Sequence, residues 1–258
     1  MIDAHMHWPK EGSNFEEKIR LLNNNMNMQN IEKGILYLID DCDYIDENYK
    51  LNFGTNIITS IALNIFEGDI DEKLDNVQKY GIKIIKILPY EQGIHYEHFK
   101  QVCEYAKKIQ ERNMILTICG SYGSKDVFKT NGVELAAAVL NSGFVNPLIV
   151  AHGGMVRQLE VHSLMCEFRN LYVDLSFTIP YWWGSHIIDD LYFMLKKDNF
   201  EHAFWGSDYP YQSYELAIQY FKKFCNKYDI SQANREKILK KNFEKFYAAV
   251  LQKAAVFA

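Results

Sequence analysis

The chain has 258 residues, of which 48% are hydrophobic, 14% aromatic and 24% charged. This composition argues against a disordered chain because it supplies enough apolar material for a core. Its net charge of -5, with basic and acidic residues interspersed, argues against a nucleic-acid-binding surface. No apolar stretch is long enough to cross a bilayer and the N-terminus lacks the features of a secretory signal, so we expect a cytoplasmic protein without a membrane partner.

The cysteine pattern also favours a cytoplasmic protein. They form no CxxC pair and show no regular spacing, which favours reduced thiols over a disulfide framework. Their positions are Cys42, Cys103, Cys119, Cys166 and Cys225.

Short segments rich in Ile, Val and Leu alternate with longer segments of helical periodicity, a pattern typical of βα units around a parallel sheet. The predicted strands are Met1 to His7, Gly34 to Ile39, Asn56 to Leu63, Ile82 to Leu88, Met114 to Cys119, Pro147 to His152, Leu171 to Ser176, and Ala203 to Asp208. The predicted helices are Phe15 to Met28, Ile70 to Tyr80, Tyr96 to Arg112, Val133 to Asn141, Val156 to Phe168, Ile187 to Lys197, Tyr214 to Tyr228, and Gln232 to Leu251.

Eight βα units without a Pro- or Gly-rich linker predict one domain over residues 1–258, folded as an α/β protein of the (β/α)₈ TIM-barrel type. A doubly wound open sheet is the alternative. The barrel is favoured because polar residues end the predicted strands, and in a barrel these ends converge on the face that holds active sites. These residues are His7, Asp40, Asn64, Lys86, Cys119, His152, Ser176 and Asp208.

The first and last strands carry candidate metal ligands. Because residues two apart in a strand point to the same side, His5 and His7 can present both imidazoles to one point. Asp208 ends the strand that lies beside the first when the barrel closes. This trio predicts a divalent metal site, with Zn favoured and Mn or Fe as alternatives. Taken singly, the histidines also fit a polar surface or core, and Asp208 fits a helix cap.

Two further strand ends carry chemistry of their own. His152 is followed by Gly153 and Gly154, which let the backbone approach a ligand or a neighbouring strand; a buried structural histidine is the alternative. Lys86 fits three roles: a carboxylated lysine bridging metals, a partner for a substrate carboxylate, or a polar residue at a strand end.

Five segments resemble the amidohydrolase-related family of the amidohydrolase superfamily, which contains hydrolases of lactones and amides and decarboxylases of the aminocarboxymuconate-semialdehyde and resorcylate types. They are Ile2 to His7, Gly81 to Pro89, Ala151 to Gly154, Asn170 to Ser176, and Gly206 to Pro210. The resemblance implies a (β/α)₈ barrel, a divalent metal on His5, His7 and Asp208, and His152 near the reacting group. By analogy alone, it also suggests a homodimer.

One position departs from the family pattern. The family usually has a histidine ligand at the end of the fifth strand, where this chain has Cys119. A thiolate binds zinc at about 2.3 Å, so Cys119 is a candidate ligand, and an ordinary buried thiol is the alternative.

Together these features predict a hydrolase that uses a metal-bound water on a small carboxylate, amide, ester or lactone. Asp208 would move the proton and His152 would stabilise charge on the substrate, with His152 also a candidate ligand. The alternatives are a metal-dependent decarboxylase on the same scaffold, a phosphoesterase or TatD-like nuclease, and a ligand-binding barrel that has lost catalysis.

Aromatic residues after the strand ends would line a pocket or simply pack over the mouth, with Arg157 or Lys86 as a partner for an anionic substrate. They are Trp8, Tyr90, Tyr122, Tyr181, Trp182, Trp183, Tyr209 and Tyr211.

Overall fold

The computed structural model describes residues 1–38, 55–121, 129 and 131–256. Eight parallel strands pair in sequence order, which confirms the predicted (β/α)₈ barrel and excludes the doubly wound sheet. The strands are β1 (Ile2–Met6), β2 (Lys33–Leu38), β3 (Ile57–Ala62), β4 (Ile84–Ile87), β5 (Ile115–Cys119), β6 (Leu148–Ala151), β7 (Leu171–Asp174) and β8 (Ala203–Phe204).

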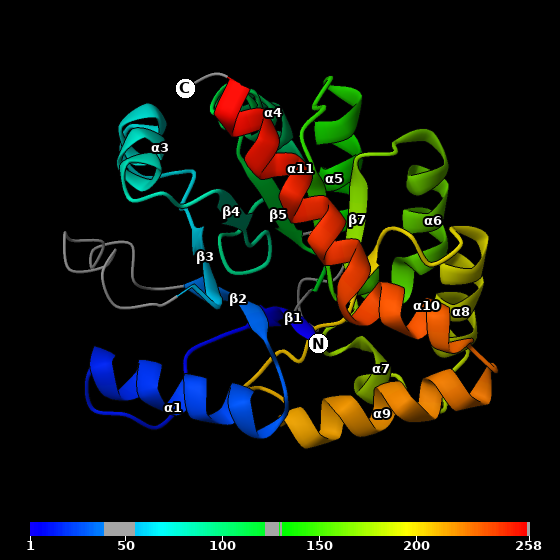
Figure 1. Ribbon diagram of the computed structural model, residues 1–258. Helices are drawn as coiled ribbons and strands as arrows, with labels where there is room; N and C mark the ends of the chain where they lie inside the picture. The colour runs from blue at the N-terminus through cyan, green and yellow to red at the C-terminus, as the bar shows by residue number, and fades with distance from the viewer. Residues whose placement is uncertain (39–54, 122–128, 130, 257–258) are drawn as a thin grey trace.

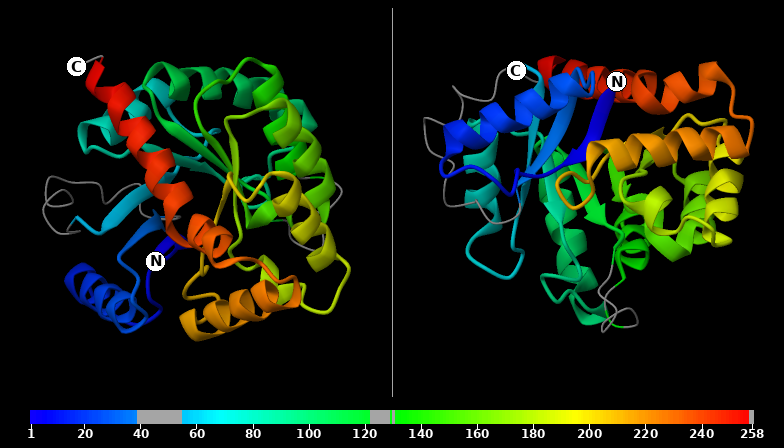
Figure 2. Two further views of the ribbon diagram at one scale, coloured as in Figure 1. Left: turned by 45° about the vertical axis from the view of Figure 1, so that its right-hand side comes forward. Right: turned by 90° about the horizontal axis from the view of Figure 1, so that it is seen from below.

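Helices surround the strands, as Figure 1 and the two views of Figure 2 show. They are α1 (Phe15–Met28), α3 (Ile70–Lys79), α4 (Phe99–Glu111), α5 (Gly132–Asn141), α6 (Gln158–Glu167), α7 (Thr178–Tyr181), α8 (Ile187–Lys197), α9 (Tyr214–Lys227), α10 (Gln232–Glu236) and α11 (Asn242–Val256). Among the described residues, no helix combines the length and apolarity needed to cross a membrane.

Several element ends differ from the predicted ones. The predicted helix from Gln232 to Leu251 is divided into α10, a π turn over Lys237–Lys241, and α11. The short helix α7 was not predicted. The eighth strand ends at Phe204, because the backbone after it hydrogen-bonds to β1 and not along β7. Ile39 and Asp40, at the predicted end of the second strand, lie outside the described residues.

The barrel core follows the alternation of the strands. Ile35 and Tyr37 of β2 point inward with Ile84, Ile115 and other inner residues, whereas the residues between them face the helices. Phe243 of α11 packs into this inner cluster, with its ring centroid 5.6 Å from that of Phe204. Apolar side chains therefore fill the N-terminal half of the barrel, and the polar strand ends are left to the opposite end.

Backbone hydrogen bonds between β1 and the segment after β8 bring the two ends of the sheet together. Ala4 N donates to Trp205 O at 2.9 Å, and Asp208 N donates to His5 O at 2.8 Å. His7 N donates to Tyr209 O at 2.6 Å. This closure places Asp208 beside His5 of β1 and His7, which follows β1.

Asp3 reinforces the closure from inside. Its Oδ1 accepts bonds from His5 N at 3.0 Å and Ser207 N at 2.9 Å, and its Oδ2 accepts from Ser207 Oγ at 2.5 Å. Burial raises the pKa of Asp3 to about 7 despite these bonds. Asp3 thus ties the first strand to the segment that carries Asp208.

We expect Asp3→Ala to lower the free energy of unfolding by about 3 kcal/mol or more, because two backbone N–H groups and one hydroxyl lose a buried acceptor at about 1–3 kcal/mol each. Urea denaturation followed by circular dichroism, in the presence of a chelator so that metal binding does not contribute, measures the change. Asp3→Asn keeps one acceptor oxygen and should lose less. A loss below about 1 kcal/mol for Asp3→Ala would show that Asp3 does not hold the closure.

Candidate metal centre

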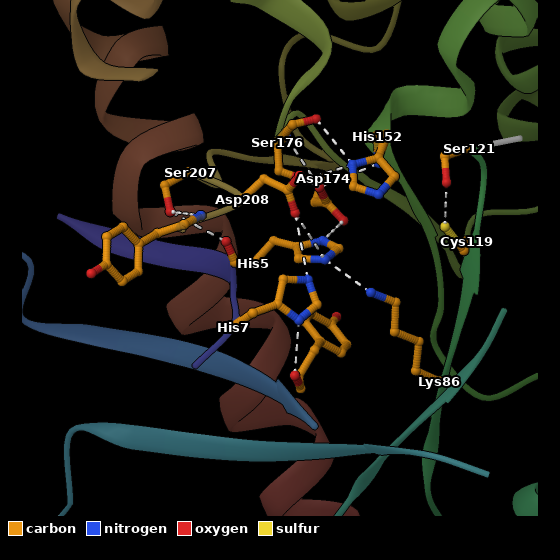
Figure 3. A network of polar contacts seen from close by, with 12 residues as sticks. His5, His7, Lys86, Cys119, Ser121, His152, Asp174, Ser176, Ser207 and Asp208 are labelled. Atoms are coloured by element: carbon orange, nitrogen blue, oxygen red, sulfur yellow. Dashed lines mark hydrogen bonds and ion pairs between the residues drawn. The ribbon is translucent and has the colours of Figure 1, made fainter. Parts of the chain in front are cut away.

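The C-terminal ends of the strands deliver a buried cluster of polar side chains to one end of the barrel, as Figure 3 shows. Each member is 7% exposed or less. They are His5 from β1, His7 just after β1, Lys86 from β4, Cys119 from β5, His152 after β6, Asp174 from β7, and Asp208 after β8. The structure thus brings together all the site residues predicted from the sequence.

His5, His7 and Asp208 form a compact set of donor atoms. Asp208 Oδ1 lies 3.6 Å from His5 Nε2 and 3.5 Å from His7 Nε2. One donor atom from each of the three residues lies within 4.8 Å of the others. A tetrahedral ion with bonds of about 2.0–2.1 Å holds its ligands about 3.3–3.4 Å apart. The trio therefore fits a divalent ion.

Neighbouring groups fix which nitrogen each histidine presents. His5 Nδ1 lies 3.0 Å from Asp174 Oδ2, and His7 Nδ1 lies 2.9 Å from Tyr37 O. Burial, with the nearby charge of Lys86, lowers the pKa of His5 to about 3, and burial lowers the pKa of His7 as well. Both rings are therefore neutral and donate through Nδ1, which leaves Nε2 as an acceptor. His5 Nε2 lies 2.9 Å from Lys86 Nζ, and both Nε2 atoms lie near Asp208 Oδ1.

Asp208 completes a set of electron-rich atoms that face one another. Burial raises its pKa, but the contact with His7 and the charge of His152 outweigh burial and keep the pKa of Asp208 below its usual range. Two lone pairs and a carboxylate in close contact repel one another unless a cation lies between them. This donor chemistry is the second reason that the site suits a metal.

Asp174 orients much of the site, although its position in the sequence predicts no role for it. Besides His5 Nδ1, it accepts bonds at Oδ1 from His152 N at 3.3 Å and from Ser176 N at 3.0 Å, and also from Ser176 Oγ. The strand alternation carried the signal: Tyr172 packs into the inner cluster, so Asp174, two residues on, also points inward. Such a carboxylate behind a ligating histidine sets its orientation and basicity.

His152 begins the loop after β6 rather than ending the strand as predicted. The backbone takes φ of 58° at His152, 57° at Gly153 and 76° at Gly154, and this left-handed turn aims the imidazole into the cluster. His152 Nδ1 lies 3.2 Å from Ser176 O and 3.0 Å from Ser176 Oγ. The ring centroid is 4.8 Å from that of His5.

Cys119 is paired with His152. Burial lowers the pKa of His152, but its bond to Cys119 and the surrounding negative charges outweigh burial and raise that pKa to about 9. Burial in turn raises the pKa of Cys119, and the bond and charge of His152 lower it by more. The sulfur also lies 2.8 Å from Ser121 Oγ. These contacts turn the thiol toward His152, so a ligand role for Cys119 stays a prediction.

A glycine supports the position of Cys119. A Cβ at Gly132 would lie 2.0 Å from Cys119 O, so only glycine allows α5 to begin against the end of β5.

Some of the aromatic and basic residues around the site pack against the protein interior, and others lie at the open end of the barrel. Tyr209 stacks on Tyr214 at 4.6 Å and so belongs to the packing, whereas Tyr211 is 60% exposed and its ring lies 5.2 Å from that of His7. Arg157 forms ion pairs of 3.0 Å with both Glu134 and Glu160. Because its guanidinium is already paired with two carboxylates, Arg157 is a poorer candidate for binding an anionic substrate. Tyr122 lies outside the described residues.

Comparisons with known proteins agree with this architecture. The family model described as "Amidohydrolase" matches residues 57–249. No curated protein sequence matches the chain significantly.

Solved structures with the same fold cover nearly the whole chain. A probable 2-pyrone-4,6-dicarboxylic acid hydrolase from Acinetobacter baumannii, with citric acid bound, has a TM-score of 0.69 and 14% identity, covering 96% of this chain and 98% of its own. A 2,6-dihydroxybenzoate decarboxylase from Rhizobium has a TM-score of 0.64 and 12% identity over 96% and 98%. A dihydroxybenzoic acid decarboxylase from Polaromonas sp. JS666, with bound manganese and the inhibitor 2-nitroresorcinol, has a TM-score of 0.63 and 14% identity over 96% of each chain.

At these identities the likeness of the structures establishes the fold alone. The family match covers most of the chain and four of the five segments that resemble the family, all but Ile2 to His7. The chain therefore belongs to the amidohydrolase family.

Proposed function

We propose that this protein is a metal-dependent hydrolase of a small carboxylate, amide, ester or lactone substrate. The observation that carries the proposal is the position of Asp208, whose ionised carboxylate contacts both histidine Nε2 atoms. His5, His7 and Asp208 would hold the ion, with Zn favoured and Mn or Fe as alternatives. A divalent ion at this point supplies a Lewis acid that polarises a substrate oxygen and acidifies a water molecule.

Two residues of the chain would carry out the proton transfers. Asp208, with its lowered pKa, takes the proton from the attacking water and delivers it to the leaving group. His152, with a pKa raised to about 9, is protonated at neutral pH and donates a hydrogen bond to the substrate oxygen on which charge develops. Asp174 and Ser176 hold His152 in place. A base and an acid held in the same buried cluster suit hydrolysis.

Decarboxylation is the second candidate, and one observation favours it. The raised pKa of His152 gives the site a buried acid that could protonate carbon as carbon dioxide leaves. The solved structures with this fold include proteins named as decarboxylases of dihydroxybenzoates. The same residues serve both reactions, so the product distinguishes them.

The decisive experiment measures metal content and product together. The purified protein is stripped with a chelator, reloaded with Zn²⁺, Mn²⁺ or Fe²⁺, and analysed by mass spectrometry for metal bound per chain. We expect stoichiometric metal in the wild type and none in His5→Ala. The matched control is His186→Ala, since His186 lies on the surface with its side chain fully exposed. Loaded protein is then screened on lactones, esters, amides and aromatic carboxylic acids, with acid release reporting hydrolysis and carbon dioxide reporting decarboxylation.

A wild type that binds no metal and needs none would overturn the metal-dependent proposal. Stoichiometric metal without turnover of any of these substrates would favour a binding protein on an enzyme scaffold. Cleavage of generic phosphodiesters would support the phosphoesterase alternative.

A further inference from the structure

A cavity away from the candidate metal centre lies between the end of α1, α9 and α10. Its volume is about 490 Å³, within the range of about 300–1,000 Å³ that small-molecule sites occupy. Figures 1 and 2 show α1 and α9 on the same side of the barrel, beside the start of β1. Gln29 Nε2, just after α1, donates to Glu215 Oε1 of α9 at 2.7 Å. The two helices are therefore linked to each other and form walls of the cavity.

Much of the cavity lining is apolar. Trp205, which follows β8 in the barrel wall, is 2% exposed, and Phe221 and Cys225 of α9 are also buried. Leu239 comes from the π turn between α10 and α11, and such turns occur frequently at functional sites. In the same turn, Ile238 O accepts a bond of 3.0 Å from Trp205 N. The turn is thus attached to the barrel wall, and its side chain adds to an apolar surface that a ligand could contact.

The charged side chains of the lining are both basic. Among the described residues that line the cavity they are Lys222 of α9 and Arg235 of α10. Neither has a carboxylate oxygen within 4.0 Å in the part of the chain that the structure describes. Arg235 Nε donates to Ile230 O at 2.8 Å, and Nη2 donates to Asn226 Oδ1 at 3.0 Å. These neutral acceptors orient the guanidinium and leave its charge without a counterion.

The positive charge of Arg235 acts on the apolar wall of the cavity. Burial raises the pKa of the Cys225 thiol to about 11, and the charge of Arg235 opposes this rise. A guanidinium binds a carboxylate through paired hydrogen bonds, and such charge-assisted bonds are stronger than neutral ones. In a chain whose net charge is -5, an apolar cavity with only basic charges on its lining is complementary to an apolar anion.

We propose that this cavity is a binding site for a small apolar carboxylate, with the acid group held by Arg235 and Lys222 and the apolar body against Trp205. The site is separate from the proposed function, because no lining residue belongs to the candidate metal centre. Its test therefore needs neither a bound metal nor turnover.

The test is isothermal titration calorimetry with 1-naphthylacetate and its uncharged counterpart, 1-naphthylacetamide. We expect saturable binding of the acid and weaker binding of the amide. Hydrogen bonds to charged groups change an equilibrium by about 10- to 100-fold, so Arg235→Gln should raise the dissociation constant of the acid by about that factor. Lys223→Gln is the matched control, because Lys223 is an exposed lysine of α9 that does not line the cavity, and it should leave the affinity unchanged.

A second variant tests the cavity rather than the charge. Ile218→Trp places a larger side chain in the lining and keeps both basic residues, so it should weaken binding of the acid and the amide alike. Circular dichroism shows whether each variant is folded. Should Arg235→Gln not fold, Lys222→Gln provides the charge comparison.

Three results would overturn the proposal. Equal affinity for the acid and the amide would show that the cavity does not recognise an anion. Binding of the acid that neither Arg235→Gln nor Ile218→Trp weakens would place the probe elsewhere on the protein, including the metal centre. A wild type without saturable binding of the acid at concentrations up to about 1 mM would show that the cavity is not a site for this class of ligand.

Discussion

Replacing Asp208 by asparagine is expected to lower kcat/KM by about 10³-fold or more while the barrel stays folded. The change removes the charge of the carboxylate that contacts His5 and His7 and therefore removes both the proton acceptor and an anionic metal donor. General-base catalysis alone contributes about 10²–10⁴-fold. The fold survives because the backbone of residue 208, which donates to His5 O, is unchanged.

Steady-state kinetics and metal content should be measured on the same samples of Asp208→Asn. We expect the metal affinity to fall with the activity, since a neutral amide is a poorer ligand than a carboxylate. Asp229→Asn is the control, because Asp229 is exposed and its φ of 49° suits asparagine as well as aspartate. An Asp208→Asn variant within tenfold of wild-type kcat/KM would remove Asp208 from the proposed proton pathway.

The barrel could be predicted from the sequence because its signal is repeated. Each strand is an apolar segment between helical segments, and the repetition of that pattern outweighs errors at single ends. The ends that were wrong depend on tertiary contacts. The eighth strand stops at Phe204, since the backbone after it bonds to β1 and not along β7. The π turn that divides α10 from α11 likewise has no local sequence signal.

The candidate site likewise contains residues that the sequence predicts and residues whose roles depend on tertiary contacts. His5 and His7 share a side because of strand alternation, and Asp208 joins them because the last strand of a barrel meets the first. Asp174 was missed because its importance lies in which groups it contacts and not in its spacing. Lys86 could be placed at the mouth, but its bond to His5 depends on a separation of 81 residues that only the folded barrel closes.

The second large effect is expected at His152, where replacement by glutamine should reduce kcat by about 10²- to 10³-fold with the metal retained. His152 is not part of the group formed by His5, His7 and Asp208, so the ion should stay. What is lost is a buried proton donor whose pKa is raised to about 9.

The pH dependence makes this prediction specific. A group that acts in its protonated form is active below its pKa, so wild-type activity should fall as the pH rises through about 9. That alkaline limb should disappear in His152→Gln, whereas His186→Gln, altered on the exposed surface, should keep both the limb and the full rate. Loss of metal in proportion to activity would instead identify His152 as a ligand, the other role that the sequence permits. Turnover by His152→Gln at the wild-type rate would exclude His152 from both roles.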